Sequence, residues 1–148
     1  RAGLPAGVFK LEISETEIMR DPEAAADAMA RLSEAGIALA LDDFGTGYSS
    51  LARLEMMPLD VVKVDQYFVR AMIGNESATT VVQSVVQLAR HFKMKVVAEG
   101  VETAETASLL AEIGCDFAQG YRYSGALAPQ DAYALIGTGL EGRFRAAS

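Results

Sequence analysis

The sequence contains one cysteine, Cys115, one histidine, His91, and no tryptophan. A single cysteine excludes an internal disulfide and a cysteine-based zinc cluster, and a single histidine excludes a metal site built from several histidines. Basic residues are in the minority, because 13 Lys and Arg stand against 20 Asp and Glu, a formal net charge of −7 in 148 residues. An acidic chain without a basic run matches a polyphosphate backbone poorly, which argues against general DNA or RNA binding.

The sequence also lacks any apolar run of the roughly 18 residues that a membrane-spanning helix needs, and it has no signal-peptide pattern. It therefore predicts a cytoplasmic segment without membrane contact, although a longer parent protein can still be tethered to a membrane. The length suits one globular domain and falls short of the roughly 200–250 residues of a complete (β/α)8 barrel.

Five short apolar runs alternate with longer segments of helical character. Val, Ile, Leu and Phe dominate the first four runs, which is typical of strands buried on both faces of a parallel sheet. Repeated β-α units with short connections and right-handed crossovers predict an α/β fold, either a doubly wound open sheet or part of a barrel. The predicted strands are Gly7 to Ile13, Gly36 to Asp42, Asp60 to Asp65, Lys95 to Glu99 and Asp116 to Tyr121.

Helix signals occupy the segments between these runs. Asp21 before Pro22 is typical of a helix N-terminus, and Gly36 stands where a C-terminal glycine is expected. Residues 137–148 lose helical periodicity and are expected to form a tail. The other predicted helices run from Ser49 or Ser50 to just before Pro58, from about Glu76 to Phe92, from Thr103 to Gly114, and onward from Pro129.

Polar residues cluster where the predicted strands end. The carboxyl ends of parallel strands lie at one edge of a sheet, and ligands bind at that edge in α/β folds. Side-chain alternation puts Lys63 and Asp65 on one face of their strand, with Val62 and Val64 on the other. The same parity directs one polar residue from each strand toward a common place: Glu12, Asp42, Lys63, Glu99 and Gln119.

Carboxylates that converge on a single lysine repel one another unless cations lie among them. Oxygen ligands without His or Cys favour hard ions such as Mg²⁺ or Mn²⁺. Asp42 and Asp43 are the best candidates to bridge ions, but strict alternation points them apart. Asp43 is therefore expected to lie in a turn, which Gly45 and Gly47 allow. Each carboxylate alone is more often a solvated charge or a helix cap, so the predicted site depends on their convergence.

Motifs at the ends of these strands occur in a characteristic order. They are Leu-Glu-Ile-Ser-Glu at 11–15, the unbroken Asp-Asp-Phe-Gly-Thr-Gly-Tyr-Ser-Ser-Leu at 42–51, and the segments 59–65, 97–103 and 114–121. Together they resemble the EAL family of cyclic di-GMP phosphodiesterases, and the stretch 42–51 matches the family's most diagnostic motif. The resemblance runs from about Leu4 to Leu135.

The resemblance implies a modified TIM-like barrel that binds cyclic di-GMP with two Mg²⁺ or Mn²⁺ ions and opens one phosphodiester to give linear pGpG. The family's first strands carry a Glu-Ala-Leu signature and an asparagine that complete the metal site. Neither is found here, and the only asparagine, Asn75, lies in a predicted loop. We therefore expect an incomplete domain of about five β-α units at residues 1–136, followed by a tail at 137–148.

The resemblance also implies a metal-binding role for four carboxylates. Glu12 would bind one metal ion, Asp42 would bridge both ions, and Asp43 would bind the second. Glu99 would act at the metal-water centre, either as a ligand or as the general base.

Further roles follow from position in the same way. Lys63 would position the attacking water, with Asp65 beside it as another catalytic residue. Glu15 would anchor the glycine turn that holds the two aspartates. The full set of supporting or substrate-binding positions is Glu15, Gly45, Thr46, Glu102 and Gln119.

Other functions stay open at this point. One alternative is a degenerate EAL domain that binds cyclic di-GMP as a receptor without cutting it. A second is an inactive fragment. An unrelated divalent-metal lyase or aldolase on a similar barrel is a weaker alternative. Formation of pGpG would distinguish the phosphodiesterase from these alternatives.

A partial barrel would expose two sheet edges, so we expect a homodimer or strands supplied from elsewhere. A longer parent protein can add sensory or GGDEF-type domains.

Overall fold

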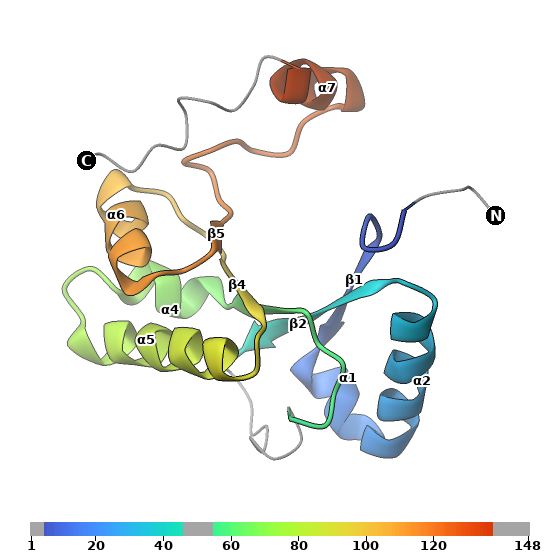
Figure 1. Ribbon diagram of the computed structural model, residues 1–148. Helices are drawn as coiled ribbons and strands as arrows, with labels where there is room; N and C mark the ends of the chain where they lie inside the picture. Colours follow the sequence, from blue (N-terminus) through green and yellow to red (C-terminus); the bar gives the residue numbers. More distant parts are fainter. Residues whose placement is uncertain (1–4, 46–54, 138–148) are drawn as a thin grey trace.

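The computed structural model describes residues 5–45 and 55–137, and within them five parallel strands form one sheet (Figure 1). The strand order is β1-β2-β3-β4-β5, so every strand pairs with its neighbour in the sequence. A doubly wound sheet reverses its strand order at a switch point, whereas a barrel does not. The sequential order therefore identifies the sheet as part of a barrel. The strands are β1 (Lys10–Ser14), β2 (Ala38–Phe44), β3 (Val61–Val64), β4 (Lys95–Ala98) and β5 (Phe117–Ala118).

Among the described residues, one or two helices follow each strand except β2. Of these, α5 is the longest and packs on β3 and β4. No helix in the described ranges combines the length and the apolar character needed to cross a membrane. The helices are α1 (Glu15–Arg20), α2 (Pro22–Glu34), α4 (Gln66–Ala71), α5 (Glu76–His91), α6 (Ala104–Ile113) and α7 (Pro129–Gly137).

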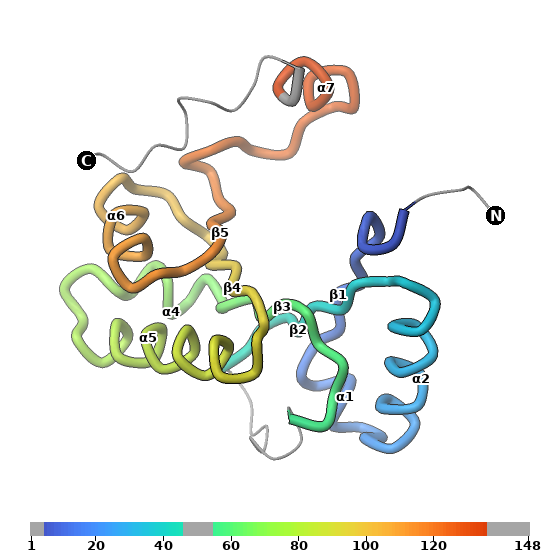
Figure 2. The backbone as a smooth tube through the Cα atoms, viewed as in Figure 1, coloured from blue at the N-terminus to red at the C-terminus, as the bar shows by residue number. Residues whose placement is uncertain are grey.

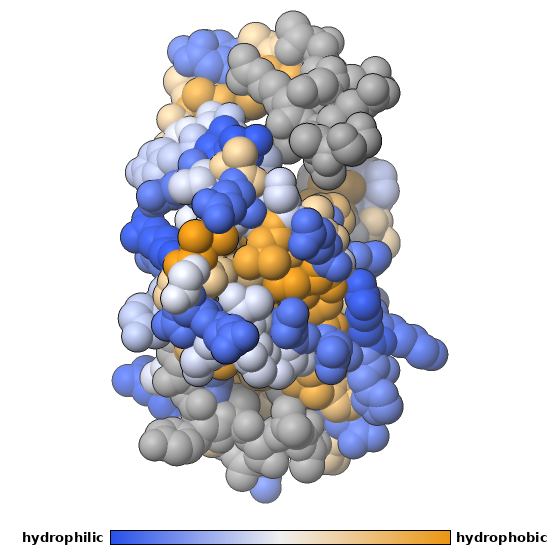
Figure 3. Space-filling model, turned by 90° about the vertical axis from the view of Figure 1, so that its left-hand side faces the viewer, coloured by the Kyte–Doolittle hydropathy of each residue, from blue (hydrophilic) through white to orange (hydrophobic). Residues whose placement is uncertain are grey.

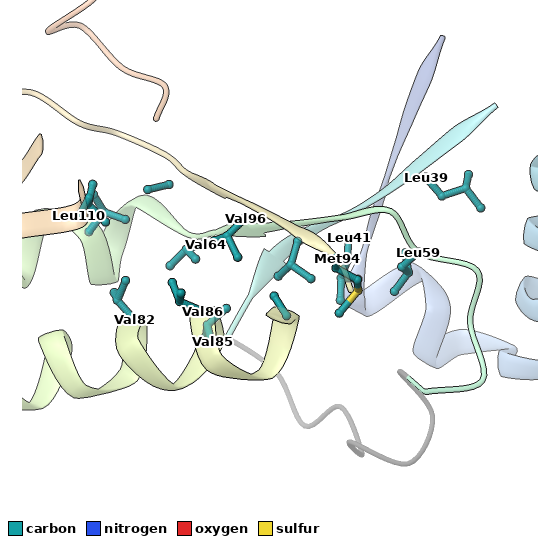
Figure 4. Close-up of a cluster of buried hydrophobic side chains, with 14 of the residues drawn as sticks. Leu39, Leu41, Leu59, Val64, Val82, Val85, Val86, Met94, Val96 and Leu110 are labelled. Carbon is teal, nitrogen blue, oxygen red and sulfur yellow. The ribbon is translucent and has the colours of Figure 1, made fainter. Parts of the chain in front are cut away.

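The apolar core lies between one face of the sheet and the helices (Figure 4). Val62 and Val64 of β3 are at most 2% exposed, as are Leu39 and Leu41 of β2 and Val82 of α5. Burying a valine or leucine side chain contributes about 1.5–3 kcal/mol, so this layer supplies most of the driving force for folding. The two-residue period that buries Val62 and Val64 turns Lys63 to the opposite face of the sheet.

The first strand differs from its prediction. It begins at Lys10 rather than Gly7, and it is not buried on both faces, because Leu11 is 44% exposed; Phe9, which was predicted in the strand and lies just before it, is 64% exposed. The reason is its place at the edge of the sheet, beyond which no further strand lies among the described residues (Figure 2). Such an edge presents unpaired backbone N–H and C=O groups.

Two short helices, α1 and α4, were not predicted. Ser14 caps α1, and its side chain and that of Glu17 form a reciprocal capping box, a pattern visible in the sequence. Asp65 caps α4 by accepting a hydrogen bond of 2.7 Å from the backbone N of Tyr67. Both helices have six residues, too few for periodicity to reveal them. The helix predicted between Ser49 and Pro58 lies mostly outside the described residues.

The other predicted helices are present with small shifts at their ends. Helix α5 begins at Glu76 as predicted and ends at His91, one residue early. Thr103 caps α6, and Gly114 closes it in the left-handed conformation at φ 84°. The predicted tail at 137–148 falls outside the described residues except at Gly137, where α7 ends.

An ion pair joins β4 to β5 at the end of the sheet where β4 begins. Lys95 Nζ lies 2.6 Å from Asp116 Oδ1, and the backbone N of Val96 donates to Asp116 Oδ2 at 3.0 Å. Burial alone would raise the pKa of Asp116, but the hydrogen bonds from Lys95 and Val96 lower it below its ordinary value. The ionised form therefore stabilises the fold above the unfolded-state pKa, and this stability is lost as pH falls through the folded-state pKa.

We expect Asp116→Asn to lower the free energy of unfolding by about 0.5–1 kcal/mol at pH 7, a modest loss because Lys95 is well exposed. The difference from the unaltered chain should be constant near neutral pH, shrink as pH falls below the ordinary pKa of an aspartate, and vanish only below the lowered folded-state pKa of Asp116. Urea unfolding at several pH values measures it, with Glu112→Gln on the exposed surface of α6 as control. A difference that grows toward acid pH would contradict the prediction.

Candidate functional site

Lys63 lies at the centre of a cluster of carboxylates that come from three other strands. Its Nζ is 2.7 Å from Glu12 Oε2 of β1, 3.0 Å from Asp42 Oδ1 of β2, and 2.7 Å from Glu99 Oε1 directly after β4. Because β1 to β4 are parallel and in sequential order, equivalent positions near their carboxyl ends meet at one rim. The structure thus brings together four of the five residues that side-chain parity directed to a common place.

The electrostatics of Lys63 follow from its surroundings. Burial alone would lower the pKa of its ammonium group, since only 5% of the residue is exposed. Hydrogen bonds with Glu12, Glu99 and Asp42 outweigh burial and hold the pKa above its usual range. Lys63 therefore stays protonated at neutral pH and neutralises part of the cluster's negative charge.

Asp43 joins the cluster by a local break in the strand. The pairing of β2 with β3 shifts between Leu41 and Phe44, and Asp43 adopts φ 56°. A bulge of this kind turns two successive side chains to the same side of the sheet. The sequence predicted a turn at Asp43, whereas the structure places the break inside β2. Aspartate tolerates the left-handed region better than most residues, which explains why it can occupy this position.

The carboxyl group of Asp43 is less acidic than usual. Burial raises its pKa, as do the charge of Asp42 and a hydrogen bond with Asp65, while Lys63 opposes them. Asp65 therefore lies against the same cluster as well as capping α4. A cation at this place would relieve the crowding of negative charge that raises the pKa of Asp43.

The cluster has the donor set of a hard divalent cation. Asp42, Asp43 and Glu99 each offer a carboxylate oxygen, and these oxygens lie within 4.8 Å of one another. With Glu12, four carboxylates face the single ammonium of Lys63, which leaves three negative charges in excess when all are ionised. Oxygen ligands and this charge fit Mg²⁺ or Mn²⁺.

The predicted supporting residues differ in their burial and in their contacts. Glu15 is buried, with 4% exposed, in the first turn of α1. Gly45 follows β2 at φ 105°, where an added Cβ would lie 3.1 Å from the ring of Phe68. Gln119 joins the structure through its backbone, which bonds to Ala98 and Val101, and its side chain is exposed. The position of Thr46 lies outside the described residues.

Glu102 forms an ion pair that the sequence did not predict. Its Oε1 lies 2.7 Å from Arg70 Nη2 on α4, rather than beside Lys63. The two residues belong to different elements with no shared motif, so local sequence patterns carry no signal for this contact.

Comparisons with known proteins identify the family of this chain. Residues 1–126 match the family model of the EAL domain. The chain is 40% identical over 124 residues to the cyclic di-GMP phosphodiesterase NbdA of Pseudomonas aeruginosa, across 84% of this chain but only 16% of that protein.

Two solved structures share the fold of this chain. The EAL domain of Mycobacterium smegmatis DcpA is 38% identical with a TM-score of 0.86, over 93% of this chain and 61% of that one. Klebsiella pneumoniae BlrP1, in a complex with manganese and cyclic di-GMP, is 36% identical with a TM-score of 0.77, over 83% of this chain and 31% of that one. The chain thus spans part of each relative, and it belongs to the EAL domain family.

Proposed function

We propose that this chain is part of a domain that hydrolyses cyclic di-GMP to linear pGpG with two bound Mg²⁺ or Mn²⁺ ions. The observation that carries the proposal is the buried ammonium of Lys63 held by three carboxylates, with Asp43 beside them. NbdA is named a cyclic di-GMP phosphodiesterase, and BlrP1 was solved with manganese and cyclic di-GMP, which supports this substrate and this class of metal.

In this proposal the carboxylates hold the ions. Glu12 and Asp43 would each bind one ion, Asp42 would bind both, and Glu99 would serve as a ligand or as the base that accepts a proton from water. Two divalent ions at such a site supply an activated water and neutralise charge on the phosphate and on the leaving oxygen.

The remaining residues orient the reacting groups. The ammonium of Lys63 has three N–H donors, all directed at carboxylates in this structure, so it would orient the attacking water by giving up one of these bonds. Asp65 stands next to Asp43 and fixes the start of α4. Glu15, the segment with Gly45 and Thr46, Glu102 and Gln119 support the site or contact the nucleotide.

The decisive test is incubation with cyclic di-GMP and Mn²⁺, followed by chromatography for pGpG. We expect pGpG from a version of the chain that includes the preceding part of the EAL domain, and none when EDTA removes the metal. Cyclic di-GMP that binds but is never cut would favour the receptor instead. Failure to bind or cleave the nucleotide by the longer version would overturn the proposal.

The expected homodimer is a separate proposal. The edge strand β1 is exposed, and apolar surface is also visible between hydrophilic residues on the side where α5 and α6 lie (Figure 3). Exposed patches of this kind often mark contacts between protein chains. Light scattering after size-exclusion chromatography should give twice the mass of the chain, and a single species of monomer mass would contradict the dimer.

A cytoplasmic location, additional sensory or GGDEF-type domains and the division of the chain at residue 136 remain predictions.

A further inference from the structure

The turn after β4 carries Glu99 into the carboxylate cluster and continues through Gly100 and Val101 to Glu102. The sheet anchors the first part of this turn, because the backbone N of Glu99 donates to Val64 O at 3.2 Å. Val101 is fully buried, and its backbone N donates to Gln119 O at 3.0 Å. The strands therefore hold the turn on one side.

Helix α4 holds the same turn from the other side. Gly100 has φ 67°, and a Cβ added there would lie 2.6 Å from the Cβ of Gln66 and 3.5 Å from Nε of Arg70. Gln66 and Arg70 are four residues apart, so they share one face of the helix, and this face covers Gly100. Arg70 then reaches past Gly100 to Glu102, with 2.7 Å between Nη2 and Oε1.

We propose that Arg70 is a positioning residue of the metal site. It spans the turn from Gly100 to Glu102 and so limits the movement of Glu99, without touching substrate or metal itself. The inference rests on the proposed function, because it concerns the placement of a carboxylate in that site. Arg70 and Glu102 are both about half exposed, so solvent weakens the pair and the expected effect is moderate.

The first test measures Mn²⁺ affinity of the chain by electron paramagnetic resonance, for Arg70→Ala, Glu102→Ala and the double variant. We expect each single variant to bind Mn²⁺ about two- to fivefold more weakly. The double variant should be no weaker than either one, because Arg70 acts through Glu102. Arg70→Lys, which keeps the positive charge, should restore most of the affinity, and Arg31→Ala on exposed α2 should change nothing. Unchanged affinity in Arg70→Ala, or effects that add in the double variant, would overturn the inference.

The second test needs no metal. Amide hydrogen exchange in the metal-free chain should be faster at Gly100, Val101 and Glu102 in Arg70→Ala and unchanged at Val96 in β4. If neither the unaltered chain nor the version that includes the preceding part of the EAL domain binds Mn²⁺, the metal site of the proposed function fails, whereas the exchange rates still test whether Arg70 holds the turn. Unchanged exchange at these three amides would show that Arg70 does not hold the turn.

Discussion

Lys63→Met should lower the free energy of unfolding by about 3 kcal/mol, near the lower end of the range for breaking a buried ion pair. Methionine preserves the length and the apolar stem of the side chain but removes the ammonium. Glu12, Asp42 and Glu99 then face one another without their shared cation. Their partial exposure lets solvent screen some of this repulsion, which keeps the loss below the upper end of the range.

Chemical denaturation measures the effect, and added Mn²⁺ sharpens it. If the carboxylates bind a divalent cation, saturating Mn²⁺ should recover part of the lost stability, because the ion replaces the missing positive charge. Lys10→Met is the matched control, since Lys10 is an exposed lysine at the start of β1. Its cost should stay within about 0.5 kcal/mol. Equal costs for the two substitutions would show that the ion pairs of Lys63 contribute little.

Asp42→Asn should remove the pairing of two metal ions. Asparagine keeps the shape of the side chain and one oxygen, but it loses the negative charge that would let the residue bridge two cations. In titrations with Mn²⁺ we expect two bound ions to fall to one at most. In a version of the domain that cleaves cyclic di-GMP, pGpG formation should fall about 100-fold or more.

The control for this substitution makes the same chemical change elsewhere. Asp116→Asn alters a carboxylate that pairs with Lys95 at the opposite end of β4, so it should leave Mn²⁺ binding unchanged at pH 7. Two ions bound with unaltered affinity by Asp42→Asn would refute the bridging role.

Local patterns in the sequence were enough to predict the parallel α/β class and the face on which Lys63 lies, whereas the barrel was expected only from the resemblance to the family. The alternation of Val62, Lys63 and Val64 requires only a regular strand, and β3 pairs with β4 without a shift of register. Caps such as Thr103 and Gly114 likewise act within one helical turn, so the ends of α6 followed from a few neighbouring residues.

The remaining features depend on contacts between distant segments. β2 pairs with β3 up to Leu41 and again at Phe44, and the shift of register between these two residues produces the bulge at Asp43. The exposure of the apolar Leu11 in β1 reflects the place of the strand at the edge of the sheet, which no local pattern reveals. Arg70 and Glu102 meet only after α4 has packed against the turn that follows β4.

The two-residue period of β3 constrains how this protein can change over evolution. Deleting or inserting a single residue in the strand would exchange Lys63 with a neighbouring valine, which puts a charge into the apolar layer and removes it from the carboxylates in one step. Length changes in the loops that flank the helices have no such consequence, because they leave the period of each element intact. Related sequences should therefore vary in length around α2, α5 and α6, while the spacing between Val61 and Asp65 stays invariant.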